Sequence, residues 1–326
     1  MLAIFSGGRT FLRLTLFLLL FTGLLLLAYV NQMGYIDSAN TGMKLSQPTN
    51  MPEFPRKIWQ SWKTPVILIE GGDKDAAKSW QVVNPTYRYE LLTDDGAITY
   101  VQERYNESHP EITKIFTDLS DVILRSDLLR YLLLYAEGGV YSDLDTTVLK
   151  PVAKWLPPQN VGPARLVVGV EVDEPKDVVS FAFCQWTVMA KPGHPTFWYM
   201  IEGAIERLRK LAIKQGTSIS AIKASYGEVL DTTGPVAWTN AVFQSLREQT
   251  GKNITASDVH GLTEPLLIGD ILVMPVTSFG NGQGHSNSKS IEDPAALVSH
   301  HFKGSWKSSH PPGQKAEPAE EEKKET

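Results

Sequence analysis

Residues 125–151 of the chain are RSDLLRYLLLYAEGGVYSDLDTTVLKP. Leucine and isoleucine recur at mixed helical spacings between residues 119 and 136, which predicts a largely buried helix. The helical pattern ends at residues 138–139, a glycine pair suited to the left-handed backbone that often closes a helix. Residues 140–142 then form a short predicted strand.

A similar alternation continues on both sides of this stretch. Short strands are expected at 57–60, 87–92, 165–172, 186–190 and 266–274, and further helices at 95–105, 196–212 and 238–249. Strands that alternate with helices predict an α/β domain with a largely parallel sheet.

Two carboxylates, Asp143 and Asp145, directly follow the predicted strand 140–142. In an extended segment this spacing places both on the same side. At a strand end of an α/β sheet, such a pair suits a divalent cation whose other positions are filled by water and phosphate oxygens. The cation would neutralise the charge that develops on a departing diphosphate. Asp143 and Asp145 are therefore the candidate catalytic and metal-binding residues.

Two further interpretations concern the neighbouring residues. Asp127 and Arg130 lie three positions apart on the predicted helix, so they share a face. They form either a helical ion pair or a carboxylate and a guanidinium that face a ribose and a phosphate. Residues 143–147 also match the Asp-X-Asp-X-Thr loop of haloacid-dehalogenase-type phosphatases, in which the first Asp attacks phosphorus. The weak preceding strand and the mid-chain position disfavour that class.

Composition excludes several other kinds of site. The net charge of −5 gives no indication of a nucleic-acid partner. Cys184 is the only cysteine, which rules out an intrachain disulfide and a zinc site built on several cysteines. Its apolar neighbours favour a buried filler over a nucleophile.

The N-terminus predicts a membrane anchor. Residues 14–30 are an uncharged, leucine-rich run preceded by Arg9 and Arg13. This pattern predicts a transmembrane signal anchor with residues 1–13 in the cytoplasm and the rest in the lumen. A cleaved signal peptide is the alternative. Sequons at Asn106 and Asn253 agree with a secretory route and are candidate N-glycosylation sites.

The remaining divisions follow from composition. Residues 31–53 are polar and lack periodicity, as expected of a stem between membrane and domain. Residues 54–307 form the predicted catalytic domain, and residues 308–326 a polar tail that we expect to be disordered.

The stretch around the aspartate pair resembles the signature of glycosyltransferase family 32, and within it the fungal initiation-specific α-1,6-mannosyltransferases. Six more segments follow the family's order: PRKIWQSWK (55–63), NPTYRYELLTDD (84–95), FCQWTVMAKPGHP (183–195), TGPVAWTNAV (233–242), MPVTSFGNGQGHS (274–286) and HHFKGSWK (300–307). Trp59 departs from the pattern, because the mannosyltransferases usually carry a histidine there.

The resemblance implies a GT-A fold, which is a Rossmann-like nucleotide-sugar-binding domain, behind the N-terminal transmembrane helix. It also implies a single-pass type II protein of the Golgi membrane with a lumenal catalytic domain. Its activity would be the α-1,6 transfer of mannose from GDP-mannose to N-linked glycans on glycoproteins, with retention of configuration and with Mn²⁺ as cofactor. A mannosyltransferase complex is a further implied partner.

The family pattern implies a role for each residue near the aspartate pair. Asp127 and Arg130 would contact the ribose and sugar of the donor. Asp145 would bind the metal directly, while Asp143 would contribute to metal or ribose binding.

The segment HFKGSW resembles a C-terminal metal-binding element of such enzymes. His301 is then the candidate third metal ligand, with His300 as the alternative, and Ser305 and Trp306 lie near the diphosphate. A neutral imidazole suits Mn²⁺ better than Mg²⁺, so a set of carboxylates and histidine favours manganese.

Aromatic and loop residues leave alternatives open. Trp59 either stacks on the guanine of the donor or belongs to the core. His285 lies in a glycine-rich loop and either covers the donor or is an exposed loop residue. Trp62, Trp186 and Trp238 are expected to be packing residues.

Two other functions remain as alternatives. The first is mannosylation of inositol phosphoceramide, but those enzymes tend to carry C-terminal membrane spans and this sequence ends in a polar tail. The second is a non-catalytic subunit of a mannan-polymerising complex, which the intact candidate metal site disfavours. No general base is assigned, because a departing phosphate can accept the acceptor's proton in a retaining transfer.

Overall fold

The computed structural model describes residues 53–174 and 181–312. The predicted cytoplasmic segment 1–13, the anchor 14–30 and the stem up to residue 52 lie outside these ranges. Within the described ranges, no helix is both long enough and apolar enough to cross a membrane.

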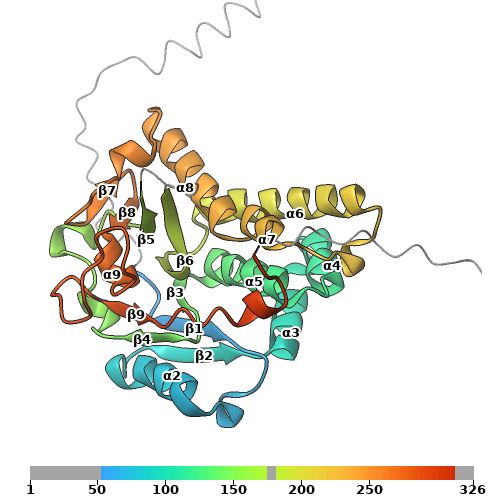
Figure 1. Cartoon of the computed structure of the whole chain (residues 1–326), viewed down its shortest axis with the longest axis horizontal. Helices are drawn as coiled ribbons and strands as arrows, with labels where there is room; N and C mark the ends of the chain where they lie inside the picture. The colour runs from blue at the N-terminus through green and yellow to red at the C-terminus, as the bar shows by residue number, and fades with distance from the viewer. Residues whose placement is uncertain (1–52, 175–180, 313–326) are drawn as a thin grey trace, which may run out of the picture. The chain divides into compact units, whose positions relative to one another are not determined.

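A seven-stranded mixed sheet forms the centre of the domain (Figure 1). Its strand order is β2 (Arg88–Leu92), β1 (Lys57–Ser61), β3 (Gly139–Ser142), β6 (Phe181–Ala190), β5 (Leu166–Asp173), β8 (Ile271–Met274) and β7 (Leu266–Ile268). Strands β2, β1, β3, β5 and β8 run in one direction, and β6 and β7 run in the other. This confirms the prediction of an α/β domain with a largely parallel sheet. The antiparallel insertion of β6 between β3 and β5 was not predicted.

The predicted strand 266–274 is wrong in one respect, because it is a hairpin. Its two halves, β7 and β8, pair antiparallel across a turn at Gly269, where φ is +59°. This backbone conformation favours glycine and allows the tight reversal.

Two helical layers cover the sheet (Figure 1). One face packs against α3 (Asp94–Tyr105), α4 (Pro110–Asp118), α5 (Val122–Glu137), α6 (Pro195–Gln215), α7 (Tyr226–Thr232) and α8 (Pro235–Thr250). The other packs against α2 (Gly71–Val83) and α9 (Val276–Gly280). Neighbouring strand residues alternate between the two cores, as Ile58 and Trp59 do on β1.

The glycine pair after α5 is required by close backbone contacts. Gly138 and Gly139 have φ of +64° and +94°. A Cβ on Gly138 would lie 2.5 Å from the carbonyl oxygen of Ala190, and one on Gly139 would lie 2.6 Å from that of Lys57. The pair therefore ends the helix and lets β3 enter between β1 and β6, which agrees with the predicted helix end.

A second sheet of two strands lies beside the main one. It pairs β4 (Thr146–Val148) with β9 (Val298–His300) in antiparallel register. This pairing brings the C-terminal segment next to the aspartate pair, although more than 150 residues separate them in the sequence.

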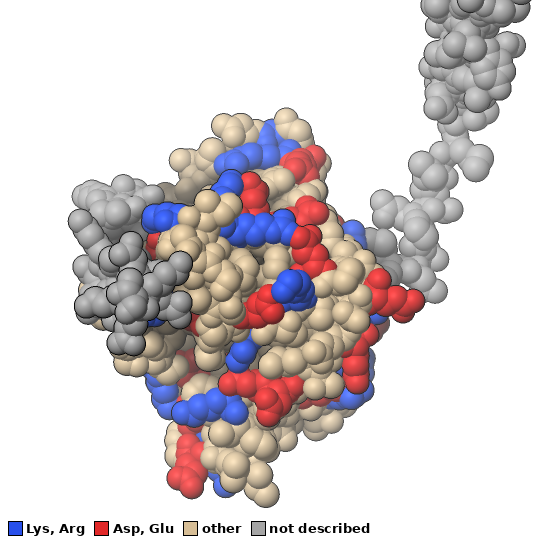
Figure 2. Space-filling model, turned by 90° about the vertical axis from the view of Figure 1, so that its right-hand side faces the viewer, with Lys and Arg blue, Asp and Glu red and all other residues tan. Residues whose placement is uncertain are grey.

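Charged residues are mixed over the face shown in Figure 2. Lysine and arginine side chains alternate there with aspartate and glutamate, without an extended region of one sign. The excess negative charge is therefore not concentrated on this face.

Candidate active site

A cleft of about 980 Å³ lies at the carboxyl ends of β1 and β3. Its walls come from the residues after these strands, from β5 and β6, from helices α5 and α7, and from the segment that follows β9. Ligands of open α/β sheets bind at this edge of the sheet. The cleft is therefore the candidate active site.

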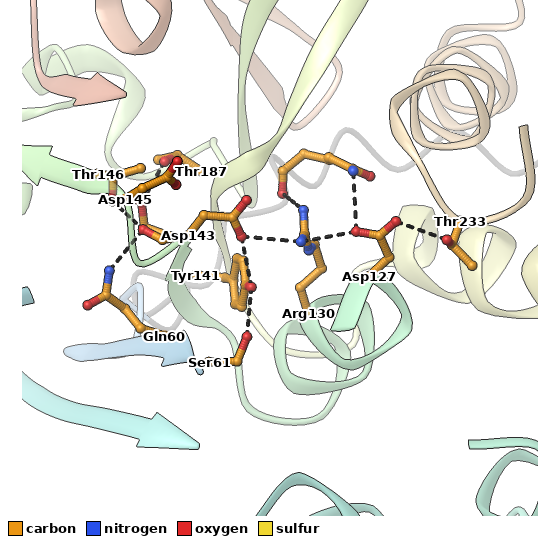
Figure 3. Close-up of polar contacts among 12 residues, drawn as sticks. Gln60, Ser61, Asp127, Arg130, Tyr141, Asp143, Asp145, Thr146, Thr187 and Thr233 are labelled. Atoms are coloured by element: carbon orange, nitrogen blue, oxygen red, sulfur yellow. Dashed lines mark hydrogen bonds and ion pairs between the residues drawn. The ribbon is translucent and has the colours of Figure 1, made fainter. Parts of the chain in front are cut away.

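Asp143 and Asp145 both line this cleft. They belong to the turn between β3 and β4, and Leu144 between them is buried against Ile69 and Ala77. The turn is held by hydroxyl groups: Thr146 Oγ1 donates a 2.6 Å hydrogen bond to the Asp143 carbonyl and lies 2.8 Å from Ser142 Oγ. These local contacts, partly visible in Figure 3, fix the backbone of the aspartate pair.

Arg130 connects helix α5 to the aspartate pair (Figure 3). Its guanidinium lies 3.0 Å from Asp127 Oδ1 and 3.2 Å from Asp143 Oδ1. The buried side chain also lies over the ring of Tyr141, 5.0 Å from its centroid. Burial alone would lower the pKa of Arg130, but Asp143 and the other neighbours raise it above its ordinary value. The guanidinium therefore stays charged and holds Asp143 in position.

Asp127 is fully buried at the inner end of this ion-pair chain. It accepts a 2.9 Å hydrogen bond from Thr233 Oγ1 and a longer one, of 3.4 Å, from Gln185 Nε2. Burial raises the pKa of Asp127 to about 7, although Arg130 and Thr233 act in the opposite direction. Of the two interpretations of this pair, the structure shows the helical ion pair, and both residues also line the cleft.

The two histidines of the C-terminal segment face opposite ways. His300 is the last residue of β9, and its Nε2 lies 3.2 Å from Asp145 Oδ1. His301 follows it, and its Nε2 lies 2.9 Å from Thr147 Oγ1 outside the cleft. Successive residues of an extended segment point to opposite sides, so only one of the pair can face the aspartates. The structure therefore places His300, the alternative to His301, beside Asp145, and the choice of metal ligand stays a prediction that this geometry turns towards His300.

Electrostatics separates the two aspartates. Burial raises the pKa of Asp143, and the charge of Arg130 only partly offsets it. Burial also acts to raise the pKa of Asp145, but the hydrogen bond and charge of His300, with the backbone amide of Lys303, lower it below its ordinary value. That amide donates a 3.0 Å hydrogen bond to Asp145 Oδ2. Asp145 is thus the more readily ionised of the two.

The segment after β9 runs from β9 towards the N-terminal end of α5 (Figure 1), and several of its residues line the cleft. Ser305 and Trp306 both line the cleft, as their predicted role near the donor requires. The Trp306 ring stacks on Tyr226 at 5.2 Å with a 10° angle between planes. At the far end, His310 Nε2 lies 2.9 Å from Asp121 Oδ2. The segment is therefore held at both ends of its path.

The structure does not bring Trp59 and His285 into the cleft. Trp59 is fully buried in the core, where its Nε1 donates a 3.0 Å hydrogen bond to the Gly138 carbonyl, so of its two interpretations the core one holds. His285 lies beside Val172 and Glu174 in a separate small depression. Neither residue is positioned to contact a donor bound near Asp143.

Three cleft residues were missed by the sequence reasoning. Trp62, which was assigned to packing, lines the cleft as the first residue after β1. Glu171 also lines it from β5. The signals were present: Trp62 follows the carboxyl end of a strand, and Glu171 interrupts an otherwise apolar strand. Trp186, also assigned to packing, lines the cleft as well.

The sequon residues lie away from the cleft on the surface. Asn106 follows α3, and Asn253 follows α8; both are exposed. Either side chain is therefore accessible to modification, and N-glycosylation stays a prediction.

The residues of the cleft fit a divalent cation that is shared with a ligand. Asp143 and Asp145 supply carboxylate oxygens, and His300 supplies an imidazole nitrogen beside Asp145. In the part of the chain that the structure describes, no three His, Cys, Asp or Glu side chains form a complete metal site. Cations bound through one or two carboxylates typically complete their shell with substrate phosphates and water. This donor set therefore suits a cation held together with a diphosphate.

Comparison with known proteins identifies the cleft's motif. The family described as "Glycosyltransferase sugar-binding region containing DXD motif" matches residues 72–162, which include Asp127, Arg130 and the Asp143–Leu144–Asp145 triplet.

Relatives extend the match over most of the chain. An initiation-specific α-1,6-mannosyltransferase of Schizosaccharomyces pombe is 33% identical over 300 residues, covering 85% of this chain and 72% of that protein. Its namesake in Candida albicans is 31% identical, covering 78% and 72%. An inositol phosphoceramide mannosyltransferase of S. pombe is 33% identical over only 101 residues, or 31% of this chain and 28% of that protein. The chain belongs to glycosyltransferase family 32, as its signature segments and its DXD triplet indicated.

Proposed function

We propose that this glycosyltransferase transfers mannose from GDP-mannose to N-linked glycans on glycoproteins, in α-1,6 linkage and with Mn²⁺ as cofactor. The observation that carries the proposal is the convergence of Asp145, His300 and the Asp127–Arg130–Asp143 ion-pair chain in one cleft. The names of the relatives that match most of the chain support mannose as the sugar. The strand arrangement and the position of the cleft are in keeping with a GT-A fold.

The donor would lie along the carboxyl edge of the sheet. Trp62, half-buried at the end of β1, offers an aromatic face on which a guanine base can stack. The diphosphate would then lie near Asp143 and Asp145, and Lys303 and Ser305 line the same cleft. This order places the nucleoside at β1 and the sugar toward β5 and β6.

The residues of the chain would act mainly by position and charge. Asp145 and His300 would hold the cation, which supplies positive charge to the departing diphosphate. Arg130 keeps Asp143 in place from the protein side. Because the leaving phosphate can take the proton of the attacking hydroxyl, no separate side-chain base is needed.

The N-terminal anchor and the Golgi location are part of the proposal. Residues 14–30 have the composition of a signal anchor, and the positive charges before them favour a lumenal catalytic domain. The exposed positions of Asn106 and Asn253 are compatible with the secretory pathway. Inositol phosphoceramide is a less favoured acceptor, because the matching transferase of that kind covers less than a third of the chain.

A donor panel tests the proposal directly. With Mn²⁺ present, the rates of transfer and hydrolysis with GDP-mannose should exceed those with UDP-glucose and UDP-galactose at least roughly tenfold. A donor with another base and sugar leaves hydrogen-bonding groups of the site unpaired, and this lowers its rate. A chelator should abolish the activity and added Mn²⁺ should restore it. A preference for a UDP-sugar would overturn the mannosyl assignment but not the family.

The histidine pair provides a second prediction with an internal control. His300→Ala should lower Mn²⁺-dependent activity roughly 10–100-fold, because the partner of Asp145 is lost. His301→Ala should change it by no more than about twofold, since that side chain is exposed and outside the cleft. Steady-state rates over a Mn²⁺ titration measure both. Equal losses, or a larger loss for His301→Ala, would contradict the assignment.

A further inference from the structure

Glu171 occupies an irregular part of the sheet at the cleft. Between Val170 and Val172 the register of β5 against β6 shifts, because these two residues pair with the adjacent Phe183 and Ala182. A β-bulge of this kind leaves one residue unpaired and redirects its side chain. Glu171 is that residue, and it lines the same cleft as Asp143.

The wall around Glu171 contains buried polar atoms that lack partners. Trp186 is only 4% exposed and lines the cleft, yet its Nε1 makes no hydrogen bond of normal geometry among the described residues, although it lies close enough to Glu171 to act on the pKa of that carboxyl. The Nδ1 atom of His300, whose ring lies 4.2 Å from that of Trp186, is buried and unpartnered in the same way. Buried polar groups are normally paired, so unpaired ones that line a cleft indicate groups that a ligand satisfies.

The chemistry of these groups selects the ligand. A carboxylate only accepts hydrogen bonds, and an indole nitrogen only donates them. A hydroxyl can do both, so neighbouring hydroxyls of one sugar can donate to Glu171 and accept from Trp186. Burial raises the pKa of Glu171, while the charge of His300 and the Trp186 side chain act to lower it. A phosphate is a poor direct partner of Glu171, because the two negative charges would repel each other without a cation between them.

We propose that Glu171 and Trp186 bind hydroxyl groups of the transferred sugar and thereby select the donor. Glu171 lines the same cleft as Asp143 and His300, beside which the diphosphate is proposed to lie. The sugar is bonded directly to that diphosphate, so it must lie within a few ångströms of it. This inference rests on the proposed function, and it adds the two residues that recognise the sugar rather than the nucleotide.

Binding measurements separate the sugar from the nucleotide. In the presence of Mn²⁺, calorimetry of wild type should show binding of both GDP and GDP-mannose. Glu171→Gln should lower the affinity for GDP-mannose roughly tenfold or more, because the charged acceptor of a sugar hydroxyl is removed. The affinity for GDP should stay within about twofold of wild type, because GDP carries no such sugar. Trp186→Phe, which keeps a ring and removes the donor, should show the same selective loss. Retained GDP binding also shows that each variant is folded.

Monodeoxy analogues of GDP-mannose identify the hydroxyl. One analogue should bind wild type about tenfold more weakly than GDP-mannose, and Glu171→Gln should bind that analogue and GDP-mannose equally well. Glu264→Gln, the same change at an exposed position outside the cleft, should behave as wild type with every ligand.

Three results would overturn the inference: unchanged GDP-mannose affinity in Glu171→Gln, equal losses for GDP and GDP-mannose, or no analogue whose effect depends on Glu171. If wild type binds neither GDP nor GDP-mannose, the proposed function itself fails, and this inference fails with it.

Discussion

Asp145→Asn should lower kcat/KM roughly 10²–10³-fold, which is the loss expected when one preorganised charge is removed from a transition state. Asparagine keeps the shape of the side chain and can still accept the hydrogen bond from the Lys303 amide. What it loses is the charge beside His300, in the carboxylate whose pKa lies below its ordinary value. The expected defect is therefore one of charge and cation binding rather than of folding.

A cation titration distinguishes this cause from a general loss of activity. Wild-type affinity for GDP should rise when Mn²⁺ is added, whereas the affinity of Asp145→Asn should hardly respond. Asp75→Asn, the same change at an exposed position on α2 outside the cleft, should match wild type in both assays. Activity of Asp145→Asn within about threefold of wild type would remove this aspartate from the metal site.

Arg130→Met should destabilise the domain by about 3–5 kcal/mol at pH 8, the cost typical of breaking a buried ion pair on one side. The change leaves Asp127, which is fully buried, and Asp143 without the guanidinium that lies within 3.2 Å of both. For a domain of this size such a loss lowers Tm by on the order of 10 °C. Denaturant unfolding and thermal melts followed by circular dichroism measure it.

Two variants test whether burial is the reason. Arg209→Met removes the exposed partner of Glu111, and it should cost less than about 1 kcal/mol, because exposed ion pairs contribute little. The double change Asp127→Asn with Arg130→Met should recover part of the loss, since one uncompensated charge disappears. A double variant less stable than Arg130→Met would contradict this account.

The pH dependence of stability gives the sign of the Asp127 contribution. Burial raises the pKa of Asp127 from its ordinary 3.8 to about 7 in the folded protein. The folded state then binds its proton more tightly, so the stability from this group is fully present below pH 3.8 and is lost as the pH rises through about 7. For the same reason the loss of stability in Arg130→Met should be smaller at pH 5.5, where Asp127 is protonated, than at pH 8, where the ionised Asp127 needs a counter-charge. A larger loss at pH 5.5 would contradict the raised pKa.

Much of the fold follows from local patterns. The buried helix α5, its end at Gly138 and Gly139 and the strand that follows were all predicted, because apolar spacing and glycine conformation act within a few residues. The α/β class follows from the alternation of such elements. The antiparallel insertion of β6 and the hairpin of β7 and β8 were not predictable in this way, since both depend on pairing between distant strands.

The residues of the candidate site also differ in whether the sequence alone could reveal them. The spacing of Asp143 and Asp145, and of Asp127 and Arg130, could be recognised because each pair lies within one short segment. Trp59 was a weaker case, because a strand residue faces either a core or a cleft, and only the packing of the sheet decides which.

The sequence by itself determined the family, the carboxylate pair and the helix that carries its partner residues. Only the tertiary structure decided that His300 rather than His301 meets Asp145, and that Glu171 faces the cleft beside Trp186. The physical reason is register. Side-chain spacing along one segment is a local property, but which side of an extended segment faces the site depends on its pairing with strands far away in the sequence, as in β4 with β9 and β5 with β6.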